Sequence, residues 1–196
     1  MKRLIKKVVL IAVMVTGLVV KANENLPKVI VSDSNPKMVQ FSFNNFDGEL
    51  RILVKDMDKV VLHSEKFIGS VYSKKYDLTN LPNGVYDVEI NGETKIKSIP
   101  FKVTNQNVEF DYDNSKVYFK PIVVVKKKKV KITKLSLNFE PMTVKVFNKN
   151  SQLIFQEVLS GKMDLKRSLE LSNLSKGAYT IALITEGKTY IEYIKL

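Results

Sequence analysis

The stretch "LTNLPNGVYDVEI" at residues 78–90 is repeated almost unchanged as "LSNLSKGAYTIAL" at residues 171–183. Both copies read Leu-x-x-Leu-x-x-Gly-x-Tyr and continue with residues of alternating polarity, at a spacing of 93 residues. The shared positions are Leu78, Leu81, Gly84, Tyr86, Leu171, Leu174, Gly177 and Tyr179. A unit of about 80 residues that occurs twice in one chain predicts two domains of the same fold.

The sequence around each copy is typical of β-strands. Segments such as "MVQFSF" (38–43) and "TVKVF" (143–147) alternate apolar and polar residues, as half-buried strands do. Turn residues follow at short intervals, for example Asn91-Gly92 and Glu186-Gly187. No apolar stripe with a 3.6-residue period follows residue 22. We therefore expect an all-β protein in which each unit is an antiparallel β-sandwich.

We interpret the repeated phrase as a corner where the chain crosses from one sheet to the other. The leucines should cap the core, and the glycines should supply a backbone angle that a side chain disfavours. The tyrosines should bury their rings and bond their hydroxyls to nearby backbone carbonyls. At the same offset of 93, residues 54–62 align with residues 147–155, so a further part of the unit should also be shared.

The first residues predict export from the cytoplasm. Basic residues at positions 2, 3, 6 and 7 precede an apolar run at 8–20 and a small residue, Ala22, which is the pattern of a signal peptide. The alternative is a retained membrane anchor, although a helix that spans a bilayer needs about 20 apolar residues. We predict cleavage after Ala22, no transmembrane helix in the mature chain, and a location in the periplasm, at the cell surface or outside the cell.

The predicted organisation follows from these features. Pro121 and the break after Asp113-Asn114 mark the boundary between the two units. The predicted segments are a signal peptide at 1–22, a lead-in at 23–37, a first sandwich at 38–112, a linker at 113–120 and a second sandwich at 121–196. The chain has no cysteine, so disulfides, thiol nucleophiles and cysteine zinc sites are excluded.

The positive charge is concentrated in one segment. Cleavage after Ala22 would remove five of the 32 basic residues and none of the 20 acidic ones, which lowers the net charge from +12 to +7. One stretch without any acid contains the lysines at positions 120, 126, 127, 128, 129, 131 and 134. The rest of the mature chain is therefore electrically balanced.

The run of lysines in this stretch is the candidate binding feature. If the run lies on one strand, adjacent lysines project to both faces and at most half of them can share a surface. One interpretation is contact with an anionic glycan, lipopolysaccharide or nucleic acid. The other is a solvated edge or interdomain loop whose lysines keep the neighbouring valines from pairing with another chain. The absence of an aromatic platform beside the lysines argues against nucleic acid. The candidate contact residues are Lys126, Lys127, Lys128, Lys129 and Lys131.

The sequence offers no catalytic constellation. Its one histidine, His63, aligns with Gln156 in the second unit and has no serine or cysteine context. The acidic clusters at 56–58 and 111–114 could bind calcium, but neither is followed by the glycine and distal glutamate of an EF-hand loop, and we favour the ordinary role of aspartate in turns. We therefore predict no catalytic residues, no metal, no cofactor and no enzymatic activity.

The sequence of the second unit resembles a known protein family. Its alternating strand, "LIF", "LSNLSKGAYTIAL", hairpin and basic final strand cover residues 143–196 and resemble the C-terminal sorting domain of type IX secretion cargo. The resemblance implies an Ig-like β-sandwich, and the first unit looks like a relative of it. It also implies export across a Gram-negative envelope, with the second unit as a candidate sorting signal.

Together these observations predict two tandem Ig-like sandwiches that act as a structural or interaction module of the cell envelope. The expected partners are an envelope protein, the secretion machinery or an anionic glycan. The alternative is an adhesion module that recognises an anionic glycan or lipopolysaccharide through Lys126–Lys131.

Overall fold

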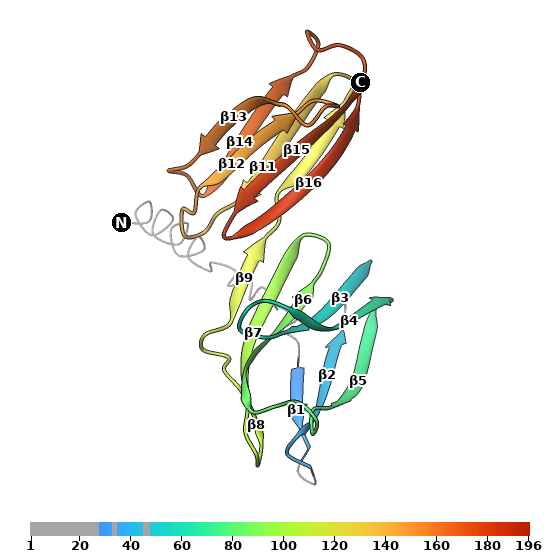
Figure 1. The fold of residues 1–196 in the computed structure, drawn as a ribbon, viewed down its shortest axis with the longest axis vertical. Helices are drawn as coiled ribbons and strands as arrows, with labels where there is room; N and C mark the ends of the chain where they lie inside the picture. Colours follow the sequence, from blue (N-terminus) through green and yellow to red (C-terminus); the bar gives the residue numbers. More distant parts are fainter. Residues whose placement is uncertain (1–27, 33–34, 45–47) are drawn as a thin grey trace, which may run out of the picture.

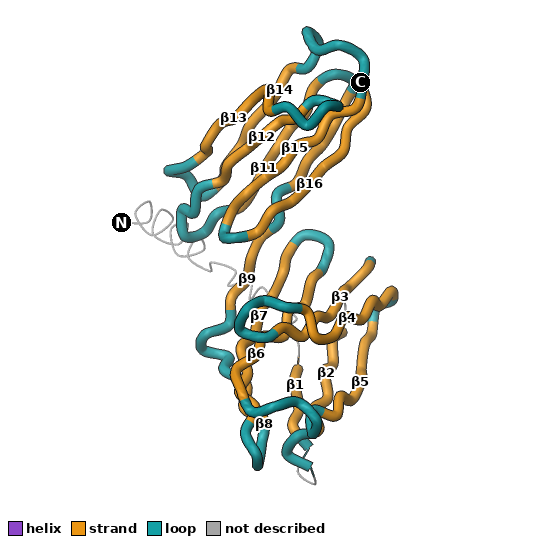
Figure 2. The backbone as a smooth tube through the Cα atoms, viewed as in Figure 1, coloured by secondary structure: helices purple, strands orange, loops and turns teal. Residues whose placement is uncertain are grey.

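The computed structural model describes residues 28–32, 35–44 and 48–196, and these residues form strands and loops without a helix (Figures 1 and 2). The predicted signal peptide lies outside the described residues. The predicted all-β class is confirmed. The strands are β1 (Lys28–Val31), β2 (Met38–Asn44), β3 (Glu49–Lys55), β4 (Val61–Ile68), β5 (Val71–Asp77), β6 (Gly84–Asn91), β7 (Lys95–Val103), β8 (Val108–Phe110), β9 (Lys116–Phe119), β10 (Ile122–Lys126), β11 (Lys129–Leu135), β12 (Met142–Phe147), β13 (Leu153–Leu159), β14 (Asp164–Glu170), β15 (Ala178–Thr185) and β16 (Lys188–Lys195).

The first unit packs two antiparallel sheets against each other. One sheet has the order β1-β2-β5, and the other has the order β4-β3-β6-β7-β8 with β9 also paired to β7. Alternate residues of each strand face inward and form one buried cluster that includes Val39, Ile52, Val88 and Ile99. Strand β1 lies in the predicted lead-in and β9 lies in the predicted linker, so both segments extend the sheets of this unit.

The second unit repeats this design. Strands β10-β11-β14 form one sheet and β13-β12-β15-β16 form the other. Val130, Ile132, Val144 and Ile181 are fully buried in a second cluster, separate from the first. The two units follow one another along the long axis of the molecule, with β9 leading from one to the other (Figure 1). Within the described residues no helix is long and apolar enough to span a lipid bilayer.

The corner is built in the same way in both units. Tyr86 and Tyr179 are buried, and each hydroxyl donates a hydrogen bond to the backbone carbonyl four residues earlier. The two distances are 2.8 Å to Pro82 and 2.9 Å to Ser175. A buried tyrosine needs such a partner, because an unpaired hydroxyl in the core costs free energy. The hydrogen bond therefore fixes the chain where it crosses between the sheets.

The role predicted for the glycines is wrong for Gly84. Gly84 does not have a positive φ; instead, a Cβ at this position would lie 3.4 to 3.6 Å from the ring of Tyr86. Gly177 has a φ of 159° and open space around it. A Cβ at Gly84 would make only ordinary van der Waals contact with Tyr86, so neither the backbone angle nor a clash explains the glycine in the first unit.

Removal of either corner hydroxyl should weaken its own unit. The Tyr86→Phe and Tyr179→Phe variants are each expected to lose about 1 kcal/mol, because a buried backbone carbonyl then lacks its donor while the ring still fills the core. Urea unfolding curves of the two variants and the parent chain measure this cost. Unchanged midpoints in both variants would contradict the role assigned to the hydroxyls.

The hairpin preceding each corner is also repeated, but at a spacing that the sequence alignment missed. Asp56 Oδ1 accepts the amide of Val60 at 2.9 Å in the turn between β3 and β4. Asn148 Oδ1 accepts the amide of Gln152 at 3.0 Å in the turn between β12 and β13. These equivalent bonds are 92 residues apart, so the alignment of these hairpins at 93 is wrong by one residue. The second unit has one extra residue between its hairpin and its corner, and the two corners are therefore 93 residues apart.

An ion pair spans the side of each sandwich. Lys74 of β5 lies 2.6 Å from Glu65 of β4, and Arg167 of β14 lies 2.6 Å from Glu157 of β13. In both units the two strands belong to different sheets. The equivalent placement of a carboxylate and a cation indicates that this contact closes the sandwich rather than serving a ligand.

The two units meet at a cluster of charges around Glu89. This carboxylate is buried on β6 and lies 2.7 Å from Lys55 of its own unit and 3.1 Å from Lys188 of the second unit. Lys188 Nζ also lies 4.7 Å from the centre of the Tyr118 ring on β9. A buried carboxylate is stable only with such partners. These contacts therefore hold the second unit against the first.

The contacts of Glu89 predict a dependence of stability on pH. Burial raises the pKa of Glu89, but the hydrogen bond from Lys55 and the charge of Lys188 outweigh it and hold the pKa below its ordinary value. A carboxyl whose folded pKa is lowered stabilises the fold above its unfolded pKa of about 4.3 and loses this effect as the pH falls through the folded value.

The Glu89→Gln variant tests this directly. It should be less stable than the parent chain at pH 7, and the difference should shrink as the pH falls below about 4. Urea unfolding at pH 7 and at pH 3.5 measures the difference. An equal difference at both pH values would show that the charge of Glu89 is not responsible.

Candidate functional site

The basic hairpin, defined here as Lys126–Lys131, joins the edge strand β10 to β11. Lys126 is paired with Lys129 across the two strands, and the turn between them contains only Lys127 and Lys128. Side chains that face each other across a hairpin project from the same side of the sheet. The expectation that adjacent lysines are split between two faces is therefore wrong, because the chain reverses direction within the run.

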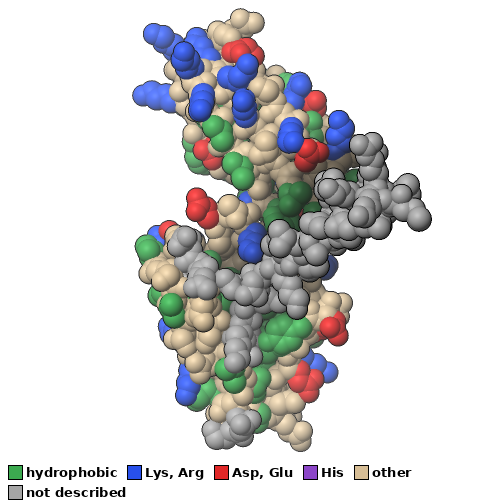
Figure 3. All heavy atoms as spheres, turned by 180° about the vertical axis from the view of Figure 1, so that it is seen from behind, with side chains coloured by type: hydrophobic (Ala, Val, Ile, Leu, Met, Phe, Trp, Pro, Cys, Tyr) green, Lys and Arg blue, Asp and Glu red, His purple; other side chains and the backbone are tan. Residues whose placement is uncertain are grey.

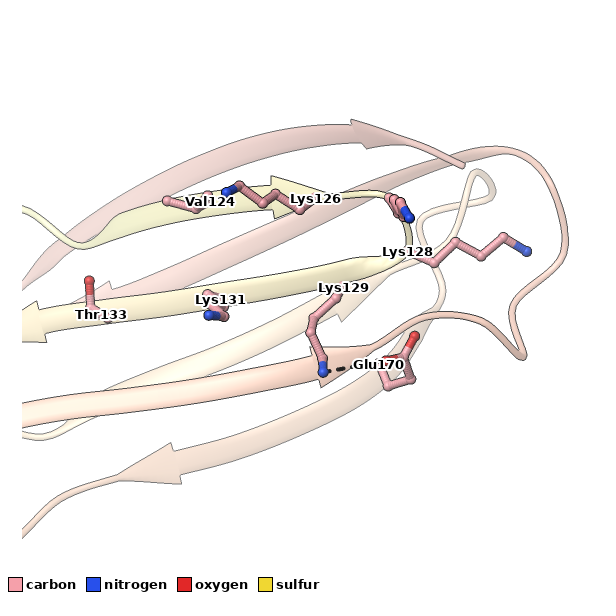
Figure 4. A pocket seen from close by; sticks show the side chains of 8 residues that line it. Val124, Lys126, Lys128, Lys129, Lys131, Thr133 and Glu170 are labelled. Carbon is pink, nitrogen blue, oxygen red and sulfur yellow. Dashed lines mark ion pairs between the residues drawn. The ribbon is translucent and has the colours of Figure 1, made fainter.

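The lysines of the basic hairpin surround one groove (Figure 4). The groove has a volume of about 760 Å³. Lys129 lies 3.9 Å from Glu170 on the neighbouring strand β14, and this is an ion pair between exposed side chains. The lining residues are Val124, Lys126, Lys127, Lys128, Lys129, Lys131, Thr133 and Glu170. All five candidate contact residues are brought together here.

The groove combines charge with apolar surface. Val124 pairs with Lys131, and its side chain is exposed on the groove side of β10. Lysine stems can lie along such apolar atoms while the ammonium groups stay in water. In a view from behind, Lys and Arg side chains gather at the end of the second unit that points away from the first (Figure 3). The five lysines that line the groove are all exposed, so the groove is open to solvent.

The hairpin carries two features that reduce local stability. Lys127 has a φ of 55°, a left-handed conformation for which glycine and asparagine are the usual residues of tight hairpins. Lys126 and Lys129 place two like charges opposite each other, which is also unfavourable. Departures of this kind from locally favourable choices occur most often at functional sites.

The first unit provides an internal comparison for this hairpin. There, Val31 pairs with Val39, just as Val125 pairs with Val130 in the second unit. The connection in the first unit is longer and reads "SDSNPKM" at 32–38, with a single lysine. The fold therefore does not require a cluster of lysines at this position.

Two lysines of the basic stretch belong elsewhere. Lys134 is buried at 3% exposure, and its Nζ lies 2.8 Å from Glu186. Lys120 lies near the contact between the units, where burial lowers its pKa. The groove also uses Glu170 from β14, and no sequence signal pointed to this residue because only strand pairing brings it to the hairpin.

His63 lies far from this groove in the first unit. It pairs with Val54 as Phe155 pairs with Val146, so its structural counterpart is Phe155 and not Gln156. Its Nε2 lies 3.6 Å from Glu65, the carboxylate of the ion pair that closes this sandwich. The histidine therefore adds to a structural contact.

The aspartates that were considered for calcium act in turns. Asp56 accepts the amide of Val60 as described above, and the two carboxylate oxygens of Asp111 accept the backbone and side-chain amides of Asn114 at 3.1 and 2.7 Å. Such bonds are the ordinary reason for aspartate in turns. Among the described residues no group of three or more histidine, aspartate or glutamate side chains could hold a metal ion.

The fold and the site together define a tandem Ig-like β-sandwich module with a basic groove. The second unit is similar to a protein family: a family model described as "Domain of unknown function (DUF3244)" matches residues 104–194. No curated protein matches the chain.

Several solved structures show a likeness in fold. One is described as "Biofilm associated protein - BSP domain", with a TM-score of 0.29 and 15% identity, over 87% of this chain and 29% of that chain. Another comes from work on the receptor tyrosine kinase Torso, with a TM-score of 0.28 and 9% identity, over 86% of this chain and 72% of that one. A third is a β-glucuronidase of Parabacteroides merdae, with a TM-score of 0.27 and 14% identity, over 87% and 26%. The chain thus spans less than a third of the first and third structures, and likeness at this level says nothing of activity.

Proposed function

We propose that this chain is an exported, non-catalytic interaction module of the cell envelope that holds an anionic saccharide in its basic groove. The observation that supports this proposal most strongly is the basic hairpin, where five lysines line one groove at a position that carries a single lysine in the duplicated unit. A saccharide with carboxylate, sulfate or phosphate groups matches this groove, because its charges meet the ammonium groups and its ring faces meet exposed Val124. The same chemistry is present in an acidic polysaccharide and in lipopolysaccharide.

Binding measurements on the full chain test this proposal. The chain is applied to immobilised acidic polysaccharides, to lipopolysaccharide and to neutral polysaccharides at low and at high salt. Binding to one or both anionic groups that weakens steeply with salt is expected. Equal binding to neutral polysaccharides, or no binding at low salt, would refute it. Release of sugar or phosphate from any of these compounds would contradict the non-catalytic role.

A second proposed role concerns export, because of the resemblance of residues 143–196 to type IX sorting domains. In this proposal the second unit directs the chain across the outer membrane. The test is a reporter fused before residues 116–196 and expressed in a host with that secretion system. Appearance of the reporter at the cell surface or in the medium is expected, whereas its retention in the periplasm would remove the sorting role.

A further inference from the structure

Strands β7 and β16, which follow the corner strands of the two units, differ in what lies beside them. Strand β7 of the first unit pairs with β6 on one side and with β8 and β9 on the other. Strand β16 is its counterpart, since each follows the strand that carries the corner tyrosine. Among the described residues β16 pairs only with β15, and it runs along the margin of its unit in Figure 1. The edge that is occupied in the first unit is therefore open in the second.

The outward side chains of these strands differ as well. At the positions of Ser98 and Pro100 on β7, strand β16 has Ile191 and Tyr193. Ser98 is buried and donates a hydrogen bond to Asp87, whereas Ile191 and Tyr193 are 45% and 80% exposed. An open strand edge beside exposed apolar side chains is a template for pairing with another strand.

We propose that β16 pairs with β16 of a second copy of this chain, in antiparallel orientation about a two-fold axis at Ile191. This pairing joins the two β13-β12-β15-β16 sheets into one continuous sheet. Ile191 then lies opposite Ile191 of the partner subunit, and Thr189 lies opposite Tyr193 of the partner subunit. In this register odd-numbered residues pair with odd-numbered residues. The outward side chains of one copy therefore lie beside the outward side chains of the other.

The composition of β16 supports a second copy as the occupant. In the register centred on Ile191, Tyr190 lies opposite Glu192 of the partner subunit, and no two like charges face each other along residues 188–194. Two neighbouring registers also keep the faces in phase. The one centred on Glu192 would place two carboxylates opposite each other, and the one centred on Tyr190 would place Tyr193 opposite Gly187, outside the strand. A strand that is complementary to itself is the requirement for a two-fold interface.

The other edges of the second unit, on β10, β13 and β14, are protected against such pairing. Strand β14 carries the adjacent cations Lys166 and Arg167, and Arg167 is paired with Glu157 of the other sheet. Strand β10 ends in the basic hairpin, and rows of lysine are a common defence of edge strands. Strand β13 has a register shift opposite Val146 and Phe147, and such an irregularity interrupts pairing. Strand β16 has lysines only at its two ends and pairs with β15 without a register shift, which leaves its central part as the edge that a second copy can join.

Sedimentation analysis over a range of protein concentrations tests the proposal. The parent chain should approach twice the mass of the single chain, and the Ile191→Lys variant should remain a single chain because two charges would then face each other at the axis. The matched control is Val158→Lys, at an exposed position on the opposite edge strand β13, which should associate like the parent chain.

A cysteine variant gives a second measurement in case Ile191→Lys fails to fold. The chain has no cysteine, so Ile191→Cys introduces the only thiol, and residues opposite each other in antiparallel strands are close enough for a disulfide. Mild oxidation should link two chains of Ile191→Cys and leave Val158→Cys unlinked. A parent chain that stays single at all concentrations, an Ile191→Lys variant that still associates, or equal linking of both cysteine variants would overturn the proposal.

Discussion

A chain in which Lys126, Lys127, Lys128 and Lys129 are all replaced by glutamine is expected to lose its affinity for anionic saccharides. A lysine near an anionic surface contributes about 1 kcal/mol to binding, so the loss for four lysines should be roughly a hundredfold or more at low salt. The dependence of the remaining affinity on salt should also become shallower, because fewer charges are left to be screened. Titration of the variant and the parent chain at two salt concentrations measures both effects.

The same variant should fold as well as the parent chain. It removes the unfavourable pair between Lys126 and Lys129, so its urea midpoint should be equal or higher. The control carries the same change in charge at four exposed lysines away from the groove, at positions 75, 149, 162 and 176. A similar loss of affinity in the control would show that the total charge of the chain, and not the basic hairpin, determines binding.

The second large effect is expected in the core of the second unit. Lys134 and Glu186 form an ion pair in which the lysine side chain is almost completely buried. Glu186→Gln removes the charge that compensates a buried ammonium group, and such a change costs about 3 kcal/mol or more. Lys134→Met replaces the ammonium group by an apolar side chain of similar length, and it should leave stability unchanged or raise it.

Urea unfolding of the single and double variants separates these effects. The double variant Lys134→Met with Glu186→Gln should regain most of what Glu186→Gln loses, because the buried charge is gone. A double variant as unstable as Glu186→Gln alone would show that the glutamate acts through other contacts.

The first unit gives the physical reason for this expectation. The amide of Leu78 donates to the carbonyl of Lys37, and the amide of Leu171 donates to that of Lys128 in the same way. Lys134 lies six residues after Lys128, and Phe43 lies six residues after Lys37. Lys134 is therefore the counterpart of Phe43, an aromatic residue in the core of the first unit. The lysine therefore occupies an apolar position, and an apolar residue can replace it.

The corner was the part of the fold that the sequence made most visible. Its hydrogen bond joins residues four positions apart, so the whole device lies within one short phrase that duplication preserved. The spacing of the hairpins was harder to predict, because "VKDMDKVVL" and "FNKNSQLIF" share a pattern and few identities. A shift of one residue leaves such a pattern plausible while it reverses the inward and outward faces.

The lysine run was visible in the sequence, but its geometry was not. A tight turn at Lys127 and Lys128 was not expected, since lysine is not a typical residue for a φ of 55°. Glu170 joins the groove only through pairing of β11 with β14, a contact between segments far apart in the chain. The burial of Lys134 was equally hidden, because its partner Glu186 is supplied by the turn between β15 and β16.

The ion pair between the two units is not symmetric. Glu89 of the first unit receives Lys188 of the second, but the residue of the second unit that corresponds to Glu89 is Ala182. A third unit of the same kind would therefore find no carboxylate to receive its lysine. The two sandwiches are similar, but the alanine at this one position means that the second unit cannot form the same ion pair with a further unit.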